Sequence, residues 1–340
     1  MDTGLDQKPS VSIIIATYNR AAVIRDTLQA MMRVVTNGVD AEWIVVNNNS
    51  TDETSGTLES FRNKLPLRIL NEPKQGKNAA LNRALREAPL RDIVVFADDD
   101  ASPQQNWIQE IVAACRRWPK TEVFGGKIVL RWPNKAPCPD WLQGSWLLSL
   151  GFAEHDLGGA ERPYPSEVYP FGSNYWCRKS IFEQGLLFRE EIGPIGSSRI
   201  MGSETSFLVP LGKRGKQMIY CPEAIVEHRL KAGDAKDGVL FRRAYSLGRG
   251  GAHIQGVYHA DLLSRWPAVW HSRQVIKVSI GFGKLISGFL KRAKRVRMEN
   301  VCRAFLYLGQ TLETSRIVLA QVRAEKESHS KPLALGRHKV

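Results

Sequence analysis

The sequence predicts an α/β fold in which a mostly parallel central sheet is flanked by helices. Short apolar runs alternate with stretches of helical periodicity through the first half of the chain. This alternation is the βαβα rhythm of a doubly wound sheet. A chain of 340 residues is long enough for one large or two ordinary domains. The expected strands are Val11–Ala16, Ile44–Val46, Leu67–Leu70 and Ile93–Ala97.

Helix-start signals follow two of these strands. Residues 50–53 (Ser-Thr-Asp-Glu) have the pattern of a capping box, and residues 102–105 (Ser-Pro-Gln-Gln) place a proline directly after an N-cap serine. Both helices would therefore be entered directly from strand ends. A further helix is expected to begin at Lys77, after Gly76.

Polar residues follow three of the expected strands, at 17–19 (Thr-Tyr-Asn), 47–49 (Asn-Asn-Asn) and 98–100 (Asp-Asp-Asp). In open sheets of this kind, ligands bind beyond the carboxyl ends of the strands. We therefore expect the three polar segments to converge on one crevice.

The last of these segments, Asp98–Asp100, concentrates negative charge beside an apolar strand. Crowded carboxylates repel one another, and their apolar surroundings make desolvation costlier, so the cluster needs a cation. Mg²⁺ or Mn²⁺ fits, because hard ions prefer oxygen ligands and often share them with substrate phosphates. A nucleotide diphosphate would then be the second occupant. The alternative is a solvated turn that caps the next helix, but the expected convergence of the three segments favours the metal.

The second half of the chain is less regular. Residues 131–170 lack periodicity and contain Trp132, Trp141 and Trp146, which indicates either a binding surface or a small satellite core. Short strands are expected at Met218–Tyr220 and Ala224–Glu227. Residues 231–325 are expected to be mostly helical, and residues 326–340 to form a flexible tail.

The net charge of +14 is concentrated in the C-terminal part. Residues 1–228 hold 26 Lys and Arg against 27 Asp and Glu, whereas residues 229–340 hold 22 against 7. Within 273–297, an apolar stretch runs into the basic run Lys291–Arg297. This run is a solvated helix face, a nucleic-acid patch or an anchor on anionic lipid. We favour the membrane surface, because a nucleic-acid patch does not need the apolar neighbour, and we expect no nucleic-acid partner.

Cysteine usage and the N-terminal sequence bear on the compartment. The five cysteines are scattered without CxxC spacing, which argues against a disulfide framework or a zinc site and fits a reducing environment. The first residues do not have the pattern of a secretory signal, and no apolar run is long enough to span a bilayer. The expected location is cytoplasmic and peripheral, at the inner face of the plasma membrane.

Taken in order, seven segments resemble the motifs of family 2 inverting glycosyltransferases of the GT-A fold. The resemblance covers residues 8–230 and implies a GT-A catalytic domain over that range. Each segment alone is weak, but their order is specific. They are VSIIIATYNR (11–20), WIVVNNNSTD (43–52), QGKNAALNRAL (75–85), FADDD (96–100), FGSNYWCR (171–178), GSETSF (202–207) and YCPEAIVEH (220–228).

The resemblance implies a DxD pair formed by Asp98 and Asp100. Asp100 would ligate Mg²⁺ or Mn²⁺, and Asp98 would bind the donor ribose or reach the metal through water. Asp99 would lie at the donor. His228 matches the family's late histidine on the metal side, although a single histidine is more often structural.

The resemblance also implies the donor site. Its expected residues are Thr17, Tyr18, Asn19, Asn47, Asn49, Lys77, Asn78, Gly172 and Asn174. Asn47 stands where the family commonly has Asp; its amide oxygen can still accept a hydrogen bond from uracil, so a UDP-sugar is favoured. Its alternative role is that of a turn residue. Trp141, Trp146 and Trp176 are candidates for stacking on the acceptor sugar, with core packing as the alternative.

Glu204 is the expected general base. The family motif usually has two acids, and here Ser203 replaces the first while Glu204 stands at the second. A carboxylate within hydrogen-bond reach and with a raised pKa can take the acceptor proton. The alternative is a helix N-terminal Glu favoured by the macrodipole.

These expectations describe a hexosyltransferase-type enzyme. It would move a sugar from a nucleotide donor to a carbohydrate or lipid-linked acceptor hydroxyl in polysaccharide or glycolipid assembly for the cell envelope. The alternatives are a non-catalytic nucleotide-sugar-binding scaffold of the same fold, suggested by Asn47 and Ser203, and a nucleic-acid-binding protein with a basic tail.

Overall fold

The computed structural model describes residues 8–195, 198–258 and 293–330, together with the short stretches 276, 279–283 and 286–287. The chain divides into two compact units, Met1–Arg243 and Ala244–Val340. The division thus falls after Arg243, later than the domain end expected at residue 230.

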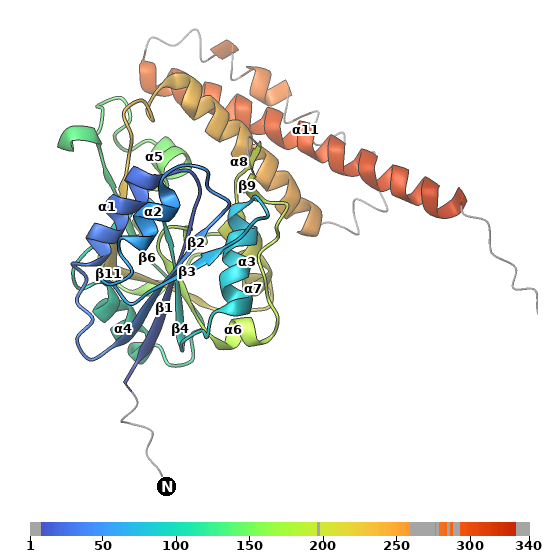
Figure 1. Cartoon of the computed structure of the whole chain (residues 1–340). Coiled ribbons are helices and arrows are strands. Elements are labelled where there is room, and N and C mark those ends of the chain that lie inside the picture. The colour runs from blue at the N-terminus through green and yellow to red at the C-terminus, as the bar shows by residue number, and fades with distance from the viewer. Residues whose placement is uncertain are drawn as a thin grey trace, which may run out of the picture. The chain divides into compact units, whose positions relative to one another are not determined.

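The first unit is built on one large sheet, which Figure 1 shows between two layers of helices. Strands β3, β2, β1 and β4 are parallel neighbours, and β6 and β11 form a second parallel pair. Strand β8 joins the two groups by pairing antiparallel with β4 and with β6. In spatial order the strands are β3 (Leu67–Asn71), β2 (Asp40–Asn47), β1 (Ser10–Thr17), β4 (Ile93–Asp98), β8 (Tyr175–Arg178), β6 (Val123–Arg131), β11 (Met218–Arg229) and β5 (Ala101–Pro103), with β7 (Arg162–Pro163) paired to β11. The expected α/β class is confirmed.

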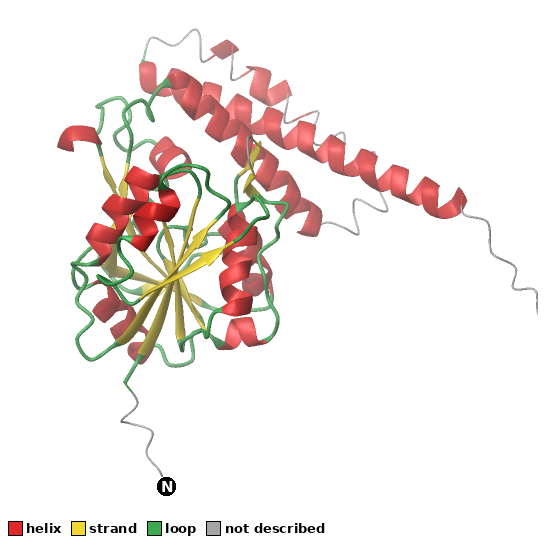
Figure 2. Cartoon of the chain, viewed as in Figure 1, coloured by secondary structure: helices red, strands yellow, loops and turns green. Residues whose placement is uncertain are grey.

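Helices cover both faces of this sheet (Figure 2). Alternate residues of each strand point to opposite faces, so Ile13 and Ile15 pack in one apolar cluster and Ile14 in the other. One cluster includes side chains of α1 and α4, and the other includes side chains of α3 and α7. The helices are α1 (Ala21–Met31), α2 (Thr54–Glu59), α3 (Lys77–Glu87), α4 (Trp107–Arg117), α5 (Leu147–Phe152), α6 (Ser180–Glu183) and α7 (Ser203–Lys213), with a short 3₁₀ turn at Pro133–Lys135 and a two-stranded sheet of β9 (Gly193–Ile195) and β10 (Ser198–Ile200).

Two expected helix starts are wrong. Ser102 and Pro103 lie in β5, and α4 begins later, at Trp107. The strand pairing explains this outcome, because Pro103 lies opposite Val226 of β11 and residues 101–103 are therefore extended instead of helical. Helix α2 begins at Thr54 instead of within the expected capping box.

The two short strands expected near residue 220 form a single strand. Strand β11 runs through both, with a register shift against β6 between Cys221 and Ile225. A bulge absorbs the intervening residues, which include Pro222, and lets the strand continue. The consequence is that His228 and Arg229 lie at the end of a central strand.

The second unit is helical where it is described. Helix α8 (Asp237–Tyr258) crosses the unit boundary, and α11 spans Lys294–Ser330. The two backbones approach closely at Gly248, where an added Cβ would collide with the carbonyl oxygen of Leu306. Buried Glu313 of α11 binds Arg249 at 2.7 Å and His253 at 3.1 Å.

Parts of the C-terminal expectations fall outside the described residues. Most of the basic apolar segment 273–297 and the tail residues 331–340 lie there, whereas residues 326–330, expected in the flexible tail, belong to α11. At the described positions of that segment, Ile276 and Phe282 are exposed. No helix in the described part of the chain is both long enough and apolar enough to cross a membrane.

Candidate active site

The expected convergence of the polar segments is observed. Thr17 pairs in register with Asn47, and Ala16 pairs with Asp98, so the carboxyl ends of β1, β2 and β4 lie side by side. The three polar segments therefore begin at the same edge of the sheet.

Arg20 organises the acids that follow β4. One guanidinium nitrogen lies 2.5 Å from Oδ1 of Asp99, and the other lies 2.8 Å from Oδ2 of Asp100. The second oxygen of Asp99 accepts a hydrogen bond from Thr17 Oγ1 at 2.9 Å. Asp99 is thus held on both sides by protein groups. Burial raises the pKa of the Asp99 carboxyl to about 6, with Arg20 opposing the rise.

Asp100 differs from Asp99 because one of its oxygens has no partner. Oδ1 of Asp100 is buried and makes no hydrogen bond with the described residues, although Nε2 of His228 lies 3.4 Å away. Burial alone would raise the pKa of Asp100, but His228 and Arg20 outweigh it and lower the pKa.

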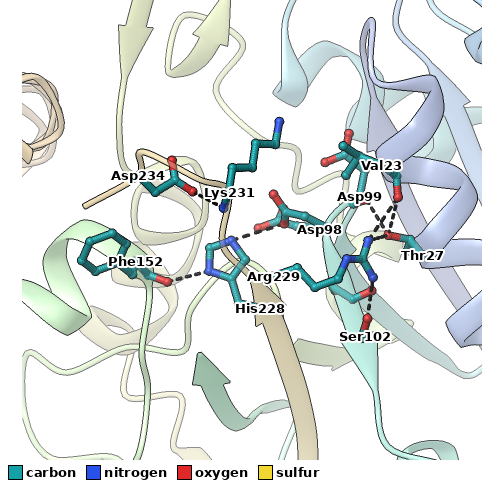
Figure 3. A network of polar contacts seen from close by, with 12 residues as sticks. Val23, Thr27, Asp98, Asp99, Ser102, Phe152, His228, Arg229, Lys231 and Asp234 are labelled. Carbon is teal, nitrogen blue, oxygen red and sulfur yellow. Dashed lines mark hydrogen bonds and ion pairs between the residues drawn. The ribbon is translucent and has the colours of Figure 1, made fainter. Parts of the chain in front are cut away.

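The ring of His228 has a fixed orientation, which Figure 3 shows between Phe152 and the acids. Nδ1 lies 2.6 Å from the carbonyl oxygen of Phe152. A carbonyl only accepts hydrogen bonds, so Nδ1 carries the proton and Nε2 of the neutral ring presents a lone pair toward Asp100.

A lone pair and an unpartnered carboxylate oxygen that face each other fit a divalent cation. No group of three or more His, Cys, Asp or Glu side chains suited to a metal occurs among the described residues. Two protein ligands are nevertheless the number expected when substrate phosphates and water complete the shell.

Glu204 lies at the same site as Asp98. Lys77, at the start of α3, forms an ion pair with Asp98, and Lys77, Gly172 and Glu204 line one narrow cavity together with Phe96 and Tyr175. Burial raises the pKa of the Glu204 carboxyl, with Lys77 opposing the rise. The carboxylate packs against Gly172, where an added Cβ would lie 3.2 Å from Oε2. The acid expected to act as base is thus close to the acids expected at the donor.

The polar turns after β1 and β2 hold each other. Oδ1 of Asn19 accepts a hydrogen bond from the backbone N–H of Thr51 at 2.7 Å. The Asn47 amide donates to Ser55 Oγ at 2.8 Å and accepts from the backbone N–H of Ser50 at 3.2 Å. Asn19 and Asn49 adopt left-handed backbone conformations, and Tyr18 is 38% exposed. The turn role considered for Asn47 is therefore observed.

Three expected ligand contacts are directed elsewhere. Asn78 donates to the carbonyl of Arg189 at 2.7 Å, although its buried Oδ1 has no hydrogen bond with the described residues. Asn174 donates to two backbone carbonyls and accepts from the Trp107 indole at 2.9 Å, so its side chain is fully used in the core. Trp176 is fully buried and stacks on Phe124 with ring centroids 5.5 Å apart, so the expectation that it presents a face to a sugar is wrong.

Trp141 and Trp146 are partly buried, and Trp146 directly precedes α5.

Sequence reasoning gave no role to Arg20, although it lies in the first motif, or to Arg229, which follows His228. The available signal for Arg20 was a cation shortly after the end of one strand, in a chain that has three acids at the end of another strand of the same expected sheet.

The comparisons with known proteins agree with this architecture. Residues 12–141 match the model of "Glycosyl transferase family 2". The probable glycosyltransferase YdaM of Bacillus subtilis is 27% identical over 53% of this chain and 43% of its own length. Glycosyltransferase AglE of Haloferax volcanii is 32% identical over 51% of this chain and 61% of its own length.

Among solved structures, the fold resembles that of mannosyltransferase PcManGT from Pyrobaculum calidifontis, determined in complex with GDP-Man and Mn²⁺. The TM-score is 0.58 at 18% identity, and the match covers 91% of this chain and 88% of that one. The chain spans about half the length of the two curated relatives named above. Residues 12–141 are thus similar to glycosyl transferase family 2, and the fold of the chain is GT-A.

Proposed function

We propose that this protein is an inverting glycosyltransferase that moves a sugar from a nucleoside diphosphate donor to an acceptor hydroxyl. The observation that carries the proposal is the common position of Glu204, Lys77 and Asp98 at the edge of the sheet where β1, β2 and β4 end. Glycosyl transfer needs a base for the acceptor proton and positive charge for the leaving phosphates. This site offers residues for both.

Glu204 takes the proton from the acceptor hydroxyl as that oxygen attacks the anomeric carbon. Its side chain lines the narrow cavity, and burial raises its pKa from the ordinary value toward the range in which a general base is most effective. Lys77 keeps the ionised form accessible and offers an ammonium group beside the donor. A single displacement with Glu204 on the acceptor side inverts the configuration.

Asp100 and His228 would hold Mg²⁺ or Mn²⁺ through Oδ1 and Nε2. Two observations support this: Asp100 Oδ1 has no hydrogen bond with the described residues, and the contact with Phe152 fixes the tautomer of His228. When bound, the ion neutralises charge on the diphosphate and makes it a better leaving group. Asp98, paired with Lys77, would bind the donor ribose or a metal-bound water.

The nucleotide would lie against the turns at 17–19 and 47–49. Asn47 Oδ1 already accepts one backbone hydrogen bond, and a carbonyl oxygen has a second lone pair that can accept the N3–H of uracil. UDP-sugars are therefore the favoured donors. The structure of PcManGT was determined with GDP-Man, so GDP-sugars are the donors to compare with UDP-sugars in a binding assay.

A polysaccharide or glycolipid acceptor of the cell envelope, and binding to the inner face of an anionic membrane, fit the charge of the C-terminal region. Residues 229–340 hold 22 Lys and Arg against 7 Asp and Glu, and Ile276, Ile280 and Phe282 are exposed. Flotation with anionic but not neutral liposomes tests this association.

A screen of nucleotide sugars for metal-dependent thermal stabilisation tests the proposed function, because a ligand that binds the folded state raises the melting temperature. We expect stabilisation by one nucleotide class with Mn²⁺ and its loss with EDTA, followed by transfer or donor hydrolysis. Donor binding without any turnover, unchanged by Glu204→Gln, would instead indicate the non-catalytic donor-binding scaffold.

A further inference from the structure

The backbone that carries Asp99 and Asp100 is held by hydrogen bonds from α1 and from the end of β11. The carbonyl oxygens of three consecutive residues, 99–101, each accept a hydrogen bond from Thr27 or Arg229. Thr27 Oγ1 lies 2.5 Å from the Asp99 oxygen, the Arg229 backbone nitrogen 3.2 Å from that of Asp100, and Arg229 Nη1 3.3 Å from that of Ala101. Figure 3 shows Arg229, Thr27 and Ser102 in this network.

Arg229 uses its guanidinium on neutral partners. It makes no ion pair with any of the residues whose positions the structure describes. Instead it donates to the Thr27 and Ser102 hydroxyls and, at 3.1 Å, to the carbonyl of Val23 in α1. A guanidinium has five donors in a rigid planar fork, so it can fix several acceptors relative to one another. The guanidinium of Arg229 therefore fixes the relative positions of the groups that it binds.

Thr27 connects Arg229 to the backbone of Asp99. A hydroxyl has one proton, and Thr27 Oγ1 already accepts a hydrogen bond from Arg229 Nη2. The proton is therefore directed at the Asp99 carbonyl, 2.5 Å away, rather than at the carbonyl of Val23, 3.2 Å away. Thr27 is fully buried, so water cannot substitute for this contact.

We propose that Thr27 and Arg229 are positioning residues for the metal site, which hold the backbone of residues 99–101 so that Asp100 Oδ1 faces His228 Nε2. Arg229 couples the two ligands directly, because it follows His228 in β11 and its backbone N–H binds the Asp100 carbonyl. The inference rests on the proposed function, since it concerns the divalent cation proposed there. Loss of a partner behind the ligands typically costs about 10–100-fold in metal affinity.

The test is a titration with Mn²⁺ in the presence of UDP and, in parallel, of GDP. Electron paramagnetic resonance measures the free Mn²⁺, at a temperature below the melting transition of every variant. We expect Thr27→Val and Arg229→Lys to weaken Mn²⁺ binding about 10-fold or more. Thr27→Ser keeps the hydroxyl and should restore wild-type affinity. Binding of the nucleotide in EDTA should be unchanged in all three variants.

Thr57→Val is the matched control. Thr57 is also buried, and its hydroxyl also accepts from an arginine, Arg25, at 3.3 Å, but no contact connects it to residues 99–101 in the described structure. This variant should bind Mn²⁺ as the wild type does. Equal Mn²⁺ affinity of Thr27→Val and Thr27→Ser would overturn the proposal, as would equal losses in Thr27→Val and Thr57→Val.

Mn²⁺ binding and sugar transfer by the wild-type protein distinguish failure of the proposed function from failure of the positioning role. A wild-type protein that binds no Mn²⁺ with either nucleotide contradicts both the proposed metal site and this inference. A wild-type protein that binds Mn²⁺ with the expected dependence on Thr27, yet transfers no sugar, contradicts the proposed catalysis and supports the positioning role.

Discussion

Nε2 of His228 faces Oδ1 of Asp100 at 3.4 Å, while Nδ1 of the same ring donates to the Phe152 carbonyl. Asp100 belongs to the loop after β4, and His228 to the end of β11. The short strand β5 joins these places, because Ala101 pairs with His228. The sheet itself thus brings together two residues that are far apart in the sequence.

Substitution of Asp100 tests this pair. Asp100→Asn should weaken Mn²⁺ binding in the presence of nucleotide by about 10-fold or more, because a neutral amide replaces a charged ligand. Isothermal titration with Mn²⁺ measures the change. Asp92→Asn is the control, since Asp92 directly precedes β4 and contacts Ser10 instead. Equal Mn²⁺ affinities of the wild type and Asp100→Asn would rule out Asp100 as a ligand.

Metal affinity should rise with pH. Burial favours the neutral ring, but the Asp100 carboxylate outweighs it and raises the pKa of His228 above its ordinary value. A proton on Nε2 competes with the metal, so the protonated ring persists to a higher pH and binding strengthens as pH increases through that pKa. Mn²⁺ titrations from pH 5.5 to 8 measure the slope. The same slope in His228→Gln would contradict this assignment.

Two tryptophan variants separate core from acceptor roles. Trp176→Ala should reduce the free energy of unfolding by about 3–5 kcal/mol, because it empties a buried position stacked on Phe124. Trp141→Ala should cost less than half of that, since Trp141 is only partly buried. Chemical denaturation measures both. An acceptor KM raised in Trp141→Ala, at unchanged donor KM, would support the sugar-stacking role, and an unchanged acceptor KM would exclude it.

Substitution of Gly172 tests whether its contact with Glu204 positions the base in the cavity. Gly172→Ala adds a Cβ 3.2 Å from Oε2 of Glu204, so the carboxylate must shift by a few tenths of an ångström. We expect kcat to fall several-fold while Mn²⁺ and donor binding are retained, because only the base moves. Gly158→Ala is the counterpart, with open space around the added Cβ, although its positive φ adds local strain. A wild-type kcat in Gly172→Ala would show that this contact does not position the base.

Much of the architecture follows from local sequence patterns. Apolar strands such as Ile93–Asp98 and the helix from Lys77 are specified by neighbouring residues, and the meeting of polar strand ends follows from parallel pairing. Strand β8 was not foreseen, because its insertion between β4 and β6 depends on partners distant in sequence. The predicted start of α4 was wrong for the same reason, because the pairing of β5 with β11 also joins segments distant in sequence.

The side chains of the site were predicted less evenly. Asp100, His228 and Glu204 could be singled out in the sequence, because their motifs end strands or begin a helix, and their chemical roles stay predictions. Asn174 and Trp176 turned out to pack in the core, and the pattern of residues around them contains no sign of which face they take. Thr27 and Arg229 act through long-range hydrogen bonds, which only the folded chain reveals.

The most direct measurement of the central claim is the rate of sugar transfer by Glu204→Gln at saturating donor and Mn²⁺. Gln keeps the shape of the side chain but cannot take a proton, so we predict that kcat falls by about 10²–10⁴-fold while donor affinity stays within a few-fold of the wild type. Glu183→Gln, an exposed change on α6, should have wild-type activity. A Glu204→Gln enzyme with the wild-type kcat would contradict the assignment of Glu204 as the base.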